Sequence, residues 1–153
     1  MRAKFHVSGL IALIISIMTA AAPAQSSQID AASPDQLVEI LKTNVLLTGD
    51  IVKRLAAQKR LAQLGKQDPQ AVVPLIIKEL SPPWSYGKTA VHQRLALIEL
   101  LRDIGAAAEP SAPLLMEILA NPQEKNQYVK MQAATALERI GSPGAKTATK
   151  QYY

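Results

Sequence analysis

The sequence predicts an all-α protein, a short α-solenoid of stacked helical hairpins. Ala, Leu and Ile supply most of the apolar residues, which favours helix over sheet. Few stretches of the 153 residues show the alternation of β-branched and polar residues that a strand needs. Apolar segments of helical length, separated by Gly or Pro, recur with a period of roughly 40 residues, which is typical of helical repeats.

The start of the chain has the pattern of an export signal. A basic beginning precedes a short apolar core at 10–18, and a small-x-small cleavage pattern ends at Ala24. We therefore expect a signal peptide at 1–24, a flexible lead at 25–32 and a periplasmic or secreted protein. The apolar core is shorter than the roughly 20 residues that a stable membrane anchor needs. An uncleaved N-terminal anchor is the alternative.

Three glycines mark the end of the first helix of each repeat. They are Gly65, Gly105 and Gly141, and the intervals between them are nearly equal. Apolar residues one, four and eight positions before each Gly share one face of a helix, as packing on a neighbour requires. These patterns predict helices over about 49–64, 89–104 and 126–140, each ended by a left-handed Gly C-cap.

The second helix of each repeat ends on a leucine. The three copies are DQLVEIL, PLIIKEL and PLLMEIL, which end at the evenly spaced Leu41, Leu80 and Leu119. Pro74 and Pro113 are expected in the first turn, where a missing N–H costs little. Ser33 is expected to be an N-cap, with Gln36 completing a capping box. The predicted helices cover about 34–43, 69–80 and 110–120.

This pattern resembles HEAT repeats, in particular the short bacterial repeats of the phycobilisome-lyase type, whose helix reads V-R-x-x-A-x-x-x-L-x-x-I-G. The last copy matches it best, through Val129, Ala133, Leu137, Ile140 and Gly141. The middle copy departs by placing Leu97 where the family prefers Ala. The resemblance covers about 33–141 and implies a right-handed, armadillo-like superhelix. Because the family consists mostly of binding scaffolds and adaptors, it also implies protein binding.

The last copy lacks a second helix. Residues 142–153 (SPGAKTATKQYY) contain none of the expected leucine pairs, so we expect a weak polar cap or a disordered tail. The outer face of the helix over 126–140 would then be incompletely covered. Self-association into a homo-oligomer, as a structural unit of the envelope, is therefore the second functional hypothesis.

The sequence offers little catalytic chemistry. It has no Cys, and His92 is the only His after the expected signal peptide. No phosphate-binding glycine loop or nucleophile elbow occurs, and the acids form no ligand loop. We therefore predict no enzyme activity, no cofactor and no metal. A lyase-type accessory enzyme that relies on His92 with Glu99 and Asp103 is the remaining alternative.

Nucleic acid is not expected as a partner. The basic residues between Lys53 and Lys66 spread around their helix instead of forming a band, and no aromatic residues are interleaved with them. The expected partner is another protein, bound by an exported scaffold through its concave face and an inter-repeat loop.

Six residues are predicted to contact that protein: Trp84, Tyr86, His92, Glu99, Arg102 and Tyr128. Trp84, the only Trp, lies with Tyr86 in a Pro-rich loop at 81–87, and exposed aromatic residues are enriched at binding hot spots. The alternative is that Trp84 folds back over the hairpin below it.

His92, Glu99 and Arg102 share one polar strip of their helix. This strip is either part of a binding face or a solvated stripe on a buried helix. Equivalent positions in adjacent copies carry opposite charges, so we expect a face that is close to neutral.

Overall fold

The computed structural model describes residues 28–42, 48–144 and 149–150. Within these ranges every regular element is a helix and no strand occurs, which confirms the all-α class. The elements are α2 (Pro34–Lys42), α3 (Thr48–Gln67), α4 (Pro69–Leu80), α5 (Lys88–Ile104), the 3-10 helix η1 (Gly105–Ser111), α6 (Ala112–Ala120) and α7 (Gln127–Ile140). None of the helices in the described part of the chain is both long enough and apolar enough to span a membrane.

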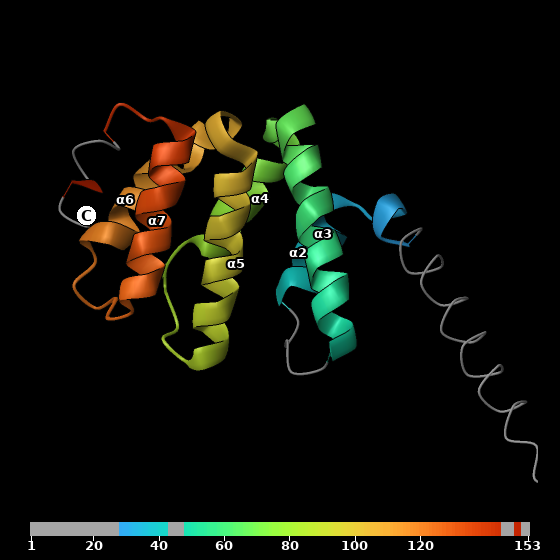
Figure 1. Cartoon of the computed structure of the whole chain (residues 1–153), viewed down its shortest axis with the longest axis horizontal. Helices are drawn as coiled ribbons and strands as arrows, with labels where there is room; N and C mark the ends of the chain where they lie inside the picture. Colours follow the sequence, from blue (N-terminus) through green and yellow to red (C-terminus); the bar gives the residue numbers. More distant parts are fainter. Residues whose placement is uncertain (1–27, 43–47, 145–148, 151–153) are drawn as a thin grey trace, which may run out of the picture.

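The helices form two layers (Figure 1). In one layer, α5 packs between α3 and α7, and all three run in the same direction. In the other layer, α2 and α4 pack on α3, and α6 packs on α7. The apolar residues between the layers form one core, in which Leu61, Ile98, Leu101 and Leu137 are fully buried.

The expected helix starts depend on local capping. The capping box before α2 is confirmed, since the Ser33 N–H donates to Gln36 Oε1 at 2.9 Å. Pro113 lies in the first turn of α6, as predicted. The prediction for Pro74 is wrong, because it lies inside α4. Asp68 begins that helix earlier, accepting a hydrogen bond from Ala71 N at 3.1 Å, and the next residue is a proline at the first helical position.

The three marker glycines have different roles. Gly141 is the predicted left-handed C-cap, with φ of +76° and ψ of 21°, and its N–H donates to the Leu137 carbonyl oxygen. Gly105 also ends its helix with φ of +76° and donates to the Leu101 carbonyl oxygen, but its ψ of −138° lies outside the left-handed helical region, so the predicted conformation is wrong there. The predicted C-cap at Gly65 is wrong, because α3 continues past it to Gln67. A Cβ on Gly65 would lie 2.5 Å from Ile104 Cδ1, so this glycine permits the close approach of α3 and α5.

Both ends of the domain contribute to packing. Residues 28–31 of the expected lead are helical, and Ile29 is buried in the core. In the expected tail, Ser142 and Thr149 are buried, and Gly144 lies close to the Met116 sulfur. The expected signal peptide at 1–24 lies outside the described residues.

Candidate binding surface

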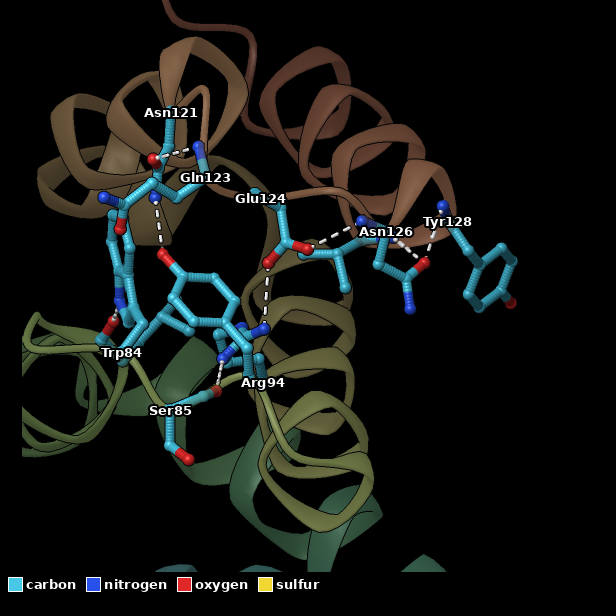
Figure 2. Close-up of polar contacts among 11 residues, drawn as sticks. Trp84, Ser85, Arg94, Asn121, Gln123, Glu124, Asn126 and Tyr128 are labelled. Atoms are coloured by element: carbon cyan, nitrogen blue, oxygen red, sulfur yellow. Dashed lines mark hydrogen bonds and ion pairs between the residues drawn. The ribbon is translucent and has the colours of Figure 1, made fainter.

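One buried arginine of α5, Arg94, contacts two loops, 81–87 and 121–126 (Figure 2). Arg94 Nη2 lies 2.8 Å from Glu124 Oε2, and the two side chains are 6% and 4% exposed. Arg94 Nη1 donates to the Ser85 carbonyl oxygen in the first loop. The other Glu124 oxygen accepts from Asn126 N at 2.9 Å, at the start of α7. The ion pair therefore sets the positions of both loops relative to α5.

Tyr86 is held by the same cluster. The Arg94 guanidinium lies 5.3 Å from the centre of the Tyr86 ring, a cation–π distance. The Tyr86 hydroxyl accepts a hydrogen bond from Asn121 Nδ2 at 3.1 Å, across the two loops. Tyr86 nevertheless remains 43% exposed. It is an aromatic side chain held in position while still presented to solvent.

Trp84 turns toward the hairpin below it. Its indole N–H donates to the Leu80 carbonyl oxygen at 2.7 Å, and its ring packs partly buried against the core. Trp84 therefore folds back over the hairpin that precedes it, as in the alternative to a fully exposed contact residue. Trp84 also borders a groove of about 490 Å³, which Tyr86 and Pro122 line as well.

A second groove brings three of the six predicted residues together. Tyr86, His92 and Tyr128 line a depression of about 700 Å³ between the start of α5 and the start of α7, and Val91 and Leu95 also line it. Tyr128 is 48% exposed, and His92 is exposed with Nδ1 2.8 Å from the Lys88 carbonyl oxygen. The groove is therefore flanked by solvent-exposed aromatic rings.

A third groove crosses all three helices of the α3, α5 and α7 layer. It encloses about 930 Å³, and Arg102 lies in it. Arg102 donates to Asp103 on its own helix and to Gln132 on α7. Glu99 lies on α5 one turn from Leu95 and one turn from Arg102, between this groove and the previous one.

This groove is more basic than the repeat positions for which a near-neutral face is expected, because it includes Lys66 and leaves out Glu99. Its charged lining consists of Lys59, Lys66, Arg102 and Arg139 against Asp103 and Glu138, an excess of two positive charges. Because α3 continues past Gly65, it carries Lys66 onto the groove surface.

No sequence pattern singles out Arg94 and Glu124 as a pair. Arg94 stands out only as a repeat position, aligned with Arg54 and Lys130. Glu124 belongs to a polar loop, NPQEKN, in which no pattern distinguishes it from its neighbours. The two lie far apart in the sequence, and only the path of the chain through α6 brings them together.

Among the residues described, no group of three or more acidic or His side chains is arranged to hold a metal ion. In particular, His92 does not join Glu99 and Asp103 in such a group. Comparison with known proteins finds no matching family model, no similar curated protein and no similar solved structure.

Proposed function

We propose that this chain is a non-catalytic scaffold, a short right-handed α-solenoid of HEAT-like hairpins that is exported and binds another protein. The binding surface is the α3/α5/α7 face, defined as the exposed and partly exposed side chains of these helices that line the 930 Å³ and 700 Å³ grooves or lie within one helical turn of those side chains. The inter-repeat loop at 81–87 borders it.

One observation supports this proposal: exposed aromatic rings flank a groove whose bordering loops are held by a buried ion pair. Tyr86 and Tyr128 are 43% and 48% exposed, while the buried Arg94–Glu124 pair holds the loops beside them. The Tyr86 ring, held by Arg94 and Asn121, loses little conformational entropy when a partner binds, and aromatic residues are enriched at binding hot spots. Such a surface binds by shape and apolar contact and requires no chemical step.

The test is a photo-crosslinking amino acid at His92, expressed in the full chain with its own N-terminus. His92 is exposed and lines the groove with the two tyrosines, so it reports directly on occupancy. Gln70, exposed on α4 in the other layer, provides the matched control position. We expect one dominant heterologous protein crosslinked from position 92 and not from position 70, with the yield reduced by Tyr128→Ala.

Two other outcomes count against the scaffold. Crosslinks only between copies of this chain, together with a concentration-dependent mass in light scattering, would support a self-assembling unit instead. Equal crosslinking from positions 92 and 70 would show that the groove is not a specific binding surface.

A further inference from the structure

The α3/α5/α7 face is divided into an apolar half and a basic half. All three helices run in the same direction, so their first turns share one end of the face (Figure 1). At this end Ile51, Val52 and Leu55 of α3 are 41%, 66% and 58% exposed. Leu55 lines the 930 Å³ groove, and the other two lie within about one turn of it on α3.

The apolar half continues across the layer. Val91 and Leu95 of α5 are partly exposed and line the 700 Å³ groove, and Tyr128 of α7 flanks it. Met131, one turn further along α7, is 40% exposed. Large apolar side chains exposed on three adjacent helices are typical of a contact surface.

The other half of the face carries basic side chains that form no ion pair within the described part of the domain. In the ranges that the structure describes, Lys59, Lys66 and Arg139 line the 930 Å³ groove and their side chains form no ion pair. All three are exposed. Arg102 lies among them and is paired with Asp103 at 3.1 Å.

A local role in helix stability accounts for only part of this charge. Lys66, Arg102 and Arg139 each lie in the last turn of their helix, where a base offsets the partial negative charge of the C-terminus. That role does not require the three side chains to face one groove. Lys59 lies two turns before the end of α3, so the same role does not apply to it.

We propose that this face binds an acidic, amphipathic polypeptide segment. In the complex, the apolar side chains of the bound segment contact Leu55 and the exposed apolar residues near it. The carboxylates of the segment lie among Lys59, Lys66 and Arg139. This inference rests on the proposed scaffold function and names the chemistry of the partner. A peptide fits better than a nucleic acid, because its carboxylates can be spaced to meet the bases and avoid Asp103 and Glu138, whereas phosphates recur at every nucleotide. The apolar half also matches side chains and not a charged backbone.

The test selects displayed random peptides on the full chain and measures the affinity of the enriched peptides by fluorescence anisotropy. We expect enriched peptides to combine apolar residues with net negative charge and to bind more weakly at higher salt. Reversal of the three unpaired bases (Lys59→Glu, Lys66→Glu and Arg139→Glu together) is expected to weaken binding by about tenfold or more.

Two controls separate a charge effect from loss of folding. Lys78→Glu reverses a last-turn base of α4, outside the proposed face, and is expected to leave the affinity unchanged. Peptides with Lys in place of each Glu are expected to bind the triple variant more tightly than the wild-type chain. An unfolded variant would not gain this affinity.

The inference is overturned if the selection enriches no peptide, if the enriched peptides show no charge preference, or if the triple variant binds them unchanged. It is also overturned if single-stranded oligothymidylate competes as well as the acidic peptides, because the groove would then be a general polyanion site. A crosslinked partner at position 92 without an acidic segment would reject this inference and leave the scaffold proposal intact.

Discussion

The guanidinium of Arg94 and the carboxylate of Glu124 lie 2.8 Å apart, with both side chains more than nine-tenths buried. The pair joins α5, in the middle of the α3, α5 and α7 layer, to the loop that precedes α7. Burying two charges has a large desolvation cost, so the net contribution of such a pair to stability is small. Removing one partner is different, because the remaining charge is then buried and uncompensated.

Glu124→Ala is therefore expected to lower the free energy of unfolding by about 3–5 kcal/mol. Urea unfolding followed by circular dichroism measures this loss. Glu117→Ala removes an exposed carboxylate from α6 and is expected to change stability by less than about 0.5 kcal/mol. The double variant Arg94→Met/Glu124→Leu is expected to be more stable than Glu124→Ala alone. Equal effects of Glu124→Ala and Glu117→Ala would contradict the buried pair.

Gly65→Ala tests the close approach of α3 and α5. The new Cβ would lie 2.5 Å from Ile104 Cδ1 in a packed core, and overpacking costs about 1–3 kcal/mol. The gain in helix propensity, about 1 kcal/mol, offsets part of this cost. Adding Ile104→Val removes Cδ1 and leaves Cγ1, which would lie 2.8 Å from the new Cβ, so it is expected to recover only part of the lost stability in a double-mutant cycle. Additive effects of the two substitutions would show that Ile104 Cδ1 is not the obstacle.

Gly141→Ala is expected to destabilise the protein through backbone strain, whereas Gly65→Ala acts through a steric clash. Gly141 has φ of +76° and no atom within 4 Å of its Cβ position, so Ala is strained there by backbone conformation alone. We expect a loss of about 1–2 kcal/mol in the free energy of unfolding. Because no contact is involved, Ile104→Val is expected to leave this loss unchanged in the corresponding cycle.

Most of the helices could be predicted because their signals are local. The apolar spacing, the capping box at Ser33 and the Gly at position 141 each act within a few residues, and the structure places the helices accordingly. The predicted C-cap at Gly65 is wrong because a glycine at a helix end and one at a helix crossing look identical in sequence. The approach of Ile104, from a different helix and far along the chain, decides between them.

The candidate surface was only partly predictable for the same reason. Helical geometry alone places His92, Glu99 and Arg102 on one strip of α5, and Tyr128 joins His92 because the repeats align. The partners of Arg94 depend on where two loops turn after leaving their helices, and no periodic pattern specifies such turns.

Lys42 at the end of α2 gives a prediction about pH. Hydrogen bonds from its ammonium to Glu79 and Glu39 raise the pKa of Lys42 above its ordinary value of 10.5. A raised folded-state pKa means that the stabilisation is fully present below pH 10.5 and is lost as pH rises through the folded-state value. Since the side chain is a third exposed, the contribution is at most about 1 kcal/mol.

Comparison of wild type with Lys42→Gln isolates this effect. The difference in their free energies of unfolding is expected to be constant from neutral pH to about pH 10 and to shrink above that range. Lys78→Gln, at the equivalent end of α4, controls for general alkaline destabilisation. A wild-type advantage over Lys42→Gln that persists undiminished at the highest pH would contradict the assignment.

Substitutions of Trp84 test whether this residue of the loop at 81–87 stabilises the fold or contacts the partner protein. Because its indole N–H is bonded to the Leu80 carbonyl and its ring packs on the core, Trp84→Phe is expected to cost about 0.5–1.5 kcal/mol of unfolding free energy, the value of the lost hydrogen bond. Trp84→Ala also removes the apolar contact and is expected to cost more. Unfolding is followed by circular dichroism, since the only Trp is the residue replaced.

The yield of partner crosslinked from position 92 then distinguishes a packing role of Trp84 from direct contact with the partner. If the ring mainly covers the hairpin, Trp84→Phe lowers stability and leaves the crosslinking yield unchanged, because the groove between α5 and α7 does not include it. Tyr86→Ala, which removes a ring that lines that groove, is expected to reduce the yield. A Trp84→Phe variant with wild-type stability and reduced yield would instead establish Trp84 as a direct contact, since only the partner would then detect the substitution.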